Sequence, residues 1–104
     1  MLQIFSEFLN RKLTSCYKYI IEFCGKAVQL KNTSYESLSM VMLLCTRMIL
    51  EDTISDDLLS NIHLKLIKKI AFFNDKTLRS LFDFTVIVWQ RRPSCIKKET
   101  LYYL

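Results

Sequence analysis

The chain has 104 residues, of which 51% are hydrophobic and 24% charged, and its formal net charge is +5. It contains one glycine, Gly25, and one proline, Pro93. A β-sandwich or barrel needs far more turn residues, and a nucleotide-binding α/β fold needs glycines at its phosphate loop. We therefore expect one all-α domain of long helices joined by short polar connections.

The first two helices are predicted at residues 2–10 and 13–30. A single continuous helix would place Ile4 and Phe8 on the polar side of the second segment, beside Lys18. A kink or turn near residues 10–14 removes this conflict. Apolar side chains cover about 200° of the helix at 13–30, whereas a surface helix needs about 100°.

The next helix is predicted at 34–50, where Thr33 followed by Glu36 forms the pattern of a capping box. Apolar residues cover about half of its circumference, where a stripe of about 100° would suffice. Leu43 and Leu50 add a second apolar patch on another side. This helix therefore has more apolar surface than a small domain can bury.

The helix at 55–72 is of the ordinary amphipathic kind, with an apolar stripe of about 120°. Ser55 or Thr53 can cap it, and Asp56 and Asp57 in its first turn favour its formation. His63 is expected at the border of its apolar stripe.

The helix at 75–91 begins at Asn74 or Asp75 and ends before Pro93, which disfavours helix at the preceding residue. Residues 85–89 also have strand propensity, but their helical phase and the flanking residues favour helix. A last helix is predicted from 95 to the end of the chain.

Helix starts near 34, 55, 75 and 95 recur about every twenty residues, and helical-hairpin repeats have periods of about 40. In helix length and spacing alone the chain resembles HEAT- or armadillo-type arrays, whose consensus residues are not recognisable in it. The predicted fold is an all-α stack of five to six antiparallel helices, and a compact helical bundle is the alternative. By its length the chain is interpreted as one domain, residues 1–104. Because both chain ends are apolar, this domain is expected to be an excised piece of a larger α-solenoid, or to dock its ends on a partner.

No residues with the spacing of a catalytic, metal or cofactor site are found. No CxxC pair occurs, and His63 is the only histidine, so we expect neither a zinc site nor an enzyme. The acidic residues at 51–57 lack the pattern of a calcium loop and are assigned to helix ends, with docking of a basic segment as the alternative. Free buried thiols are expected in a reducing compartment, nucleus or cytoplasm, at four positions: Cys16, Cys24, Cys45 and Cys95.

The longest uncharged run near the middle of the chain, 37–46, is far shorter than the roughly 20 residues of a membrane span. No signal peptide is recognised at the start of the chain. We therefore expect no membrane partner.

The surplus apolar surface predicts a non-enzymatic protein-interaction module, or scaffold, that binds a partner's amphipathic helix or helical subunit, or its own copy. Trp89 and Phe82 are also candidates for the internal core. Aromatic residues dominate interface hot spots, and the candidate partner-binding residues are Phe84, Trp89, Leu101, Tyr102 and Tyr103.

The alternative function is a basic module that binds nucleic acid or chromatin. Phosphate binding requires clustered cations. Two groups of basic residues are candidates for this role: Lys65, Lys68 and Lys69, and Arg91, Arg92, Lys97 and Lys98.

Overall fold

The computed structural model describes the backbone of residues 17–102 and the side chains of residues 18–100. The helix predicted at 2–10 lies outside these residues. The described part of the chain is all-α and contains no strand. Its elements are α2 (Tyr17–Gln29), α3 (Tyr35–Leu50), α4 (Asp56–Lys68), η2 (Ile70–Phe72), α5 (Asp75–Arg91), η3 (Pro93–Cys95) and η4 (Lys98–Tyr102), where η denotes a 3-10 helix.

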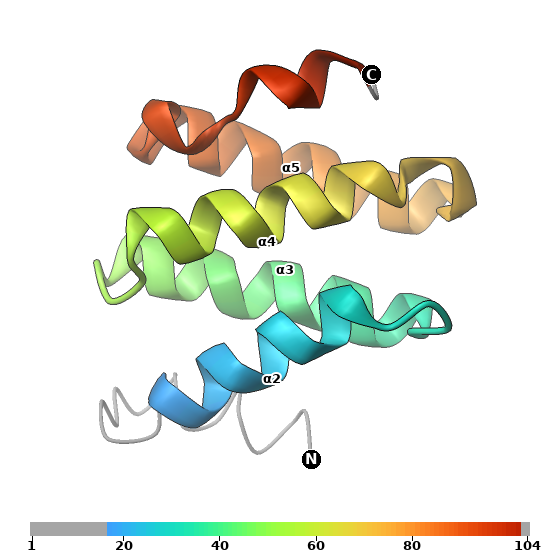
Figure 1. Cartoon of the computed structure of the whole chain (residues 1–104), viewed down its shortest axis with the longest axis horizontal. Coiled ribbons are helices and arrows are strands. Elements are labelled where there is room, and N and C mark those ends of the chain that lie inside the picture. The colour runs from blue at the N-terminus through green and yellow to red at the C-terminus, as the bar shows by residue number, and fades with distance from the viewer. Residues whose placement is uncertain (1–16, 103–104) are drawn as a thin grey trace.

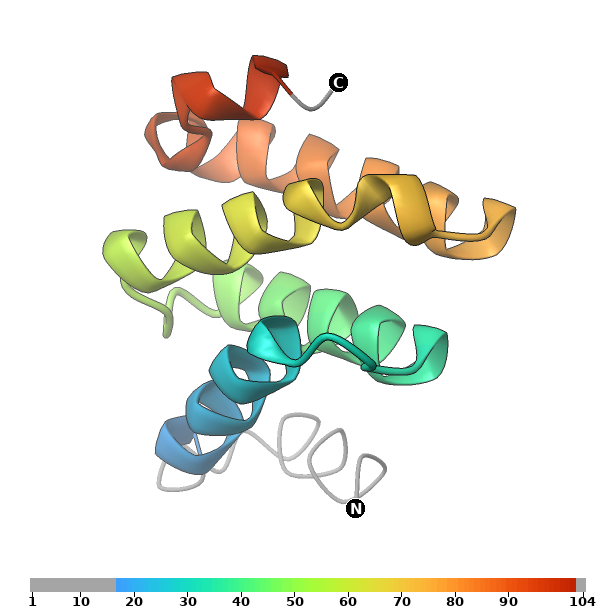
Figure 2. The same cartoon turned by 45° about the vertical axis from the view of Figure 1, so that its right-hand side comes forward.

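The four α-helices lie in two layers, with α2 and α4 in front of α3 and α5 (Figure 1). Helices that follow one another in sequence run antiparallel. Within the layers α2 contacts α4 and α3 packs along α5, and η3 and η4 contact α4. Figure 2 shows the same helices turned by 45°. The Cα radius of gyration is 12.8 Å, close to the roughly 13 Å of a compact domain of 100 residues.

Three polar side chains cap the N-termini of α3, α4 and α5. Ser34, Ser55 and Asn74 each accept a hydrogen bond from the backbone N–H three residues ahead, at 3.1, 3.3 and 2.8 Å. The predicted caps of α4 and α5 are therefore confirmed. The capping box predicted at Thr33 is wrong, because the Thr33 hydroxyl donates backward to the carbonyl of Ala27 at 2.6 Å and closes α2 instead.

The C-terminus of α3 closes in a Schellman motif. The Asp52 N–H bonds to the carbonyl of Ile49 at 3.1 Å, and the Thr53 N–H bonds to that of Met48 at 2.9 Å. Asp52 has a φ of 57°, a conformation for which glycine is usual and aspartate is tolerated. This turn reverses the chain so that α4 can run back along the molecule.

Two of the predicted α-helices differ from the structure. The α-helix of the 55–72 segment ends at Lys68, and the 3-10 helix η2 follows it. The single helix predicted from 95 is wrong, since the segment forms η3 and η4. Extended backbone at Ile96 separates them, and no side chain caps the start of η3, so no α-helix is nucleated there. The helix at 75–91 is confirmed, strand-like segment included.

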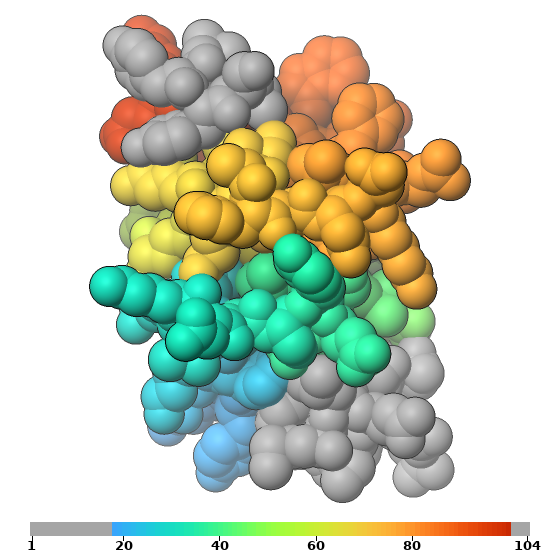
Figure 3. Space-filling model, turned by 90° about the vertical axis from the view of Figure 1, so that its right-hand side faces the viewer, coloured from blue at the N-terminus to red at the C-terminus, as the bar shows by residue number. Residues whose placement is uncertain are grey.

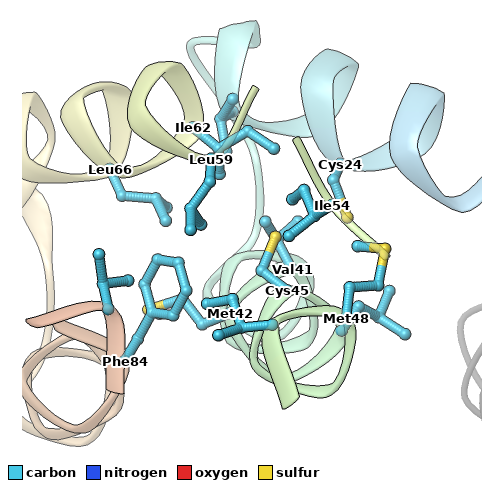
Figure 4. Close-up of a cluster of buried hydrophobic side chains, with 14 of the residues drawn as sticks. Cys24, Val41, Met42, Cys45, Met48, Ile54, Leu59, Ile62, Leu66 and Phe84 are labelled. Atoms are coloured by element: carbon cyan, nitrogen blue, oxygen red, sulfur yellow. The ribbon is translucent and has the colours of Figure 1, made fainter. Parts of the chain in front are cut away.

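The core lies between the two layers and takes residues from all four α-helices (Figure 4). Cys24 of α2 lies near Cys45 of α3, while Leu59 and Leu66 of α4 approach Phe84 of α5. The core side of α5 also includes Thr77, which is 1% exposed. The residues of α5 that reach the core are therefore Thr77, Leu81, Phe84 and Val88.

The roles expected of Phe82 and Phe84 are reversed, and Trp89 lies at the surface rather than in the core. Phe84, predicted to lie at an interface, is only 2% exposed, while Phe82 and Trp89 are 69% and 65% exposed. Phe82 and Phe84 are two residues apart and thus about 200° apart around the helix, so they cannot share a face. The prediction that Phe84 binds a partner is wrong, because this side chain fills the core.

Candidate functional site

One side of α5 carries a row of apolar side chains, which we call the α5 stripe: Leu78, Phe82, Val86 and Trp89. Their spacing of four, four and three residues places them on one face of a helix. Phe82 and Trp89 are exposed, and Leu78 and Val86 are half-buried. The stripe lies away from the residues that α5 presents to the core. It is an aromatic surface about three helical turns long.

Of the predicted partner-binding residues, Trp89 lies on the α5 stripe. Phe84 lies in the core, where its ring packs against that of His63 with centroids 5.8 Å apart. Leu101 and Tyr102 belong to η4 by their backbone, but their side chains lie outside the described residues, as does Tyr103. Partner binding by the C-terminal residues stays a prediction.

The acidic residues after α3 bind a basic residue of the same chain. Arg92, at the end of α5, contacts Asp52 at 2.5 Å and Asp56 at 2.9 Å. The same guanidinium donates to the backbone carbonyl of Ile54. The side chain of Arg92 is only 15% exposed. These contacts fix the α3–α4 loop to the end of α5. The basic residue that these carboxylates bind therefore belongs to the same chain, and docking of a partner's basic segment stays a prediction.

The candidate nucleic-acid residues do not all remain available at the surface. Arg92 is engaged as described, and Lys69 is half-buried, with one N–H group of its ammonium donated to the carbonyl of Leu30 at 2.6 Å. Lys65 is half-buried. The residues of this set that are exposed are Lys68, Arg91, Lys97 and Lys98. Lys68, Arg91 and Lys98 lie on α4, α5 and η4, and Lys97 lies between η3 and η4. Their binding to nucleic acid stays a prediction.

His63 is fully buried rather than at the border of the apolar stripe. Its Nε2 lies 3.0 Å from the hydroxyl of Thr85, and its Nδ1 is buried without a hydrogen-bond partner. Burial lowers the pKa of His63 to about 4, so the ring is neutral near pH 7. The ring acts as a packing residue of the core beside Phe84.

Cys24, Cys45 and Cys95 are buried free thiols, as predicted, and Cys16 lies outside the described residues. A hydrogen bond with Cys24, together with burial, raises the pKa of Cys45 well above its ordinary value. Burial also raises the pKa of Cys95. A nucleophilic cysteine needs a thiolate and access to solvent. All three thiols lack access to solvent, and the raised pKa values of Cys45 and Cys95 also disfavour their thiolates.

Among residues 17–102, no three side chains of the types that bind metals gather at a metal site. Over the same residues, no helix combines the length and the apolar character needed to cross a membrane.

A second surface, which the sequence did not predict as a site, lies along α3 and α5. Three adjoining hollows of about 760, 470 and 230 Å³ follow one side of α3, and we call them together the α3–α5 groove. The first lies between the α2–α3 loop, the start of α3 and η2, and the other two lie between α3 and α5. Tyr35, Leu43 and Phe72 are exposed hydrophobic residues that line it. The sequence signal was the second apolar patch on α3, where Leu43 and Leu50 are indeed exposed.

Comparison of the chain with protein-family models, with curated proteins and with solved structures gave no match.

Proposed function

We propose that this chain is a non-enzymatic protein-interaction module that packs the α5 stripe against a helix of another protein. The observation that carries the proposal is the exposure of Phe82 and Trp89 on one face of a capped, 17-residue helix. Large exposed aromatic residues that share a face are typical of interface hot spots. Along the stripe the apolar side chains follow one another at about one helical turn, and its two aromatic side chains are about two turns apart.

The layered packing supports a helical partner. In the rear layer α5 lies beside α3, and the α5 stripe lies away from the side that contacts α3. The helices α2 with α3 and α4 with α5 are two successive antiparallel pairs, and such pairs form helical-hairpin arrays. We therefore also propose that these two pairs form a stack of helical hairpins. A further helix laid beside α5 would extend the rear layer and cover the stripe.

Site-specific photocrosslinking in the native cell tests the proposal. A photoreactive phenylalanine is placed at Phe82 or at Trp89 in the full chain. As a matched control it is placed at Tyr19, which is also aromatic and 63% exposed but lies on α2. Both α5 positions are expected to give an adduct with the same protein, and Tyr19 is expected not to give it. The substitution Phe82→Glu should remove the adduct formed from Trp89.

Two results would contradict the proposal. One is an adduct that is equally strong from Tyr19 and from the α5 positions. The other is an adduct of the chain with its own copy alone, which would identify self-association instead. Circular dichroism and thermal melting of the variants check that each is folded. An exposed position is expected to tolerate these changes within about 0.5 kcal/mol.

A further inference from the structure

The length of the α3–α5 groove suits a peptide segment. Tyr35 lines both the first and the second hollow, and Ser39 and Leu43 line both the second and the third. The α3 residues that line the groove run from Tyr35 to Thr46, which are separated by about 16 Å along the helix at a rise of about 1.5 Å per residue. This distance corresponds to about three turns of a bound helix.

The apolar residues of the groove are spaced along that length. Tyr35 and Leu43 lie two turns apart on the same face of α3, and Phe72 faces the first hollow from η2. Their exposed fractions are 46%, 50% and 76%. An amphipathic helix binds a groove of this kind by inserting residues from one face.

The charges along the groove differ between its two ends. Lys31 and Lys69 line the first hollow, and no carboxylate lines it. Glu36 and Lys76 balance each other in the second hollow, and Asp83 is the charged residue of the third. The N-terminus of α3 also lies at the first hollow and adds positive partial charge. The groove is therefore complementary to a segment whose negative end lies over Lys31 and Lys69.

The basic end of the groove is held in place by contacts between two loops. The Lys69 ammonium donates to the carbonyl of Leu30 at 2.6 Å, and the Tyr35 hydroxyl donates to that of Phe72 at 2.7 Å. Figure 3 looks onto this end of the molecule, where the α2–α3 and α4–α5 loops lie side by side. Lys69 keeps two of its three N–H groups for a ligand. A site fixed before binding loses less conformational entropy when it binds.

We propose that the α3–α5 groove binds an amphipathic helix of a partner protein, with the acidic C-terminal turn of that helix over Lys31 and Lys69. The C-terminus of a helix carries negative partial charge, so its dipole and its acidic side chains favour the same orientation. The bound helix then runs antiparallel to α3. This site is separate from the α5 stripe and does not depend on the function proposed for it.

Selection from a phage-displayed library of random peptides, panned on the full chain, tests this proposal. Enriched peptides are expected to combine apolar residues at helical spacing with acidic residues in the C-terminal part. Their dissociation constants are then measured by fluorescence anisotropy on the protein and on two pairs of variants. Lys31→Glu is paired with Lys98→Glu, an equal change of charge outside the groove. Leu43→Glu is paired with Leu50→Glu, since Leu50 is 49% exposed on the same helix but does not line the groove.

Lys31→Glu and Leu43→Glu are each expected to weaken binding at least tenfold, because the first places like charges opposite each other and the second places a charge at an apolar contact. Their paired controls should change binding less than about twofold. A version of the peptide with its acidic residues moved to the N-terminal end should also bind more weakly. Equal loss in both members of either pair, enrichment of basic peptides, or no enrichment would overturn the proposal. Phe82→Glu should leave this binding unchanged, which separates a failure here from a failure at the α5 stripe.

Discussion

At the scale of single residues, the aromatic side chains of α5 divide between core and surface according to their angle around the helix. Phe84 lies on the side of Leu81 and Val88, where α4 approaches, and it packs against His63. Phe82 lies about 200° away and is exposed. Deleting a buried phenylalanine costs about 3–5 kcal/mol, whereas a surface change costs little. The same residue type therefore stabilises the fold at one position and is available for binding at the other.

The buried His63 makes the stability of the fold sensitive to acid. Its pKa is about 4 in the folded chain, against an ordinary value of 6.5 in the unfolded chain. Between these values the unfolded chain binds a proton that the folded chain does not bind, so the free energy of unfolding falls as the pH drops from 6.5 toward 4. The expected loss from this residue between pH 7 and pH 5 is about 2 kcal/mol.

Urea unfolding at pH 7 and pH 5 measures this loss in the wild type and in His63→Leu. The other titrating groups are common to both proteins, so the difference between them isolates the histidine. The variant should lose about 2 kcal/mol less than the wild type between the two pH values. An equal loss in both proteins would show that His63 binds its proton in the folded state.

At the scale of elements, polar contacts at the helix ends set where each helix begins and ends. Ser34, Ser55 and Asn74 start three helices, and Asp52 in a left-handed conformation closes α3. Arg92 then joins the α3–α4 loop to the end of α5. Exposed ion pairs contribute little on their own. Here the Arg92 guanidinium also donates a hydrogen bond to the backbone carbonyl of Ile54, and together these contacts fix the position of the C-terminal end of α5.

Gly25 lies in the interior of α2, and the structure shows no reason for a glycine there. A Cβ atom built at this position meets nothing within 4 Å, and the backbone does not have a positive φ. Because glycine in a helix interior is less favourable than alanine, Gly25→Ala should raise the free energy of unfolding by about 0.5–1 kcal/mol. Urea denaturation measures this change, and a destabilised variant would indicate that the site tolerates no side chain.

At the scale of the whole molecule, the exposed large hydrophobic residues among those whose side chains are described are divided over several elements. Two of them, Phe82 and Trp89, belong to the α5 stripe. Tyr35, Leu43 and Phe72 line the α3–α5 groove, which also carries opposite charge at its two ends. The molecule thus presents two surfaces with different chemistry, one aromatic on α5 and one amphipathic along α3, which also takes residues from the α2–α3 loop and η2.

The fluorescence of Trp89, the only tryptophan, reports on the α5 stripe. Because its side chain is 65% exposed, the folded protein should emit near the wavelength of the unfolded chain in urea. Covering the stripe with a partner helix removes water from the indole and should shift the emission to shorter wavelength. A dilute folded protein that already emits at short wavelength would show that the stripe is covered without a partner.

The sequence alone determined that the described part of the chain is helical and where most of its helices start, because periodicity, caps and Pro93 act locally. It also indicated a surplus of apolar surface. It could not decide which apolar residues are buried, since α5 offers more of them than one core can accept and uses Thr77 on its core side. Only the packing of α3 and α4 against α5 selected Phe84 over Phe82, buried His63 and joined Arg92 to Asp52 and Asp56. The basic end of the α3–α5 groove likewise exists only because the α2–α3 loop and the segment after α4 meet, and its two lysines, Lys31 and Lys69, come one from each.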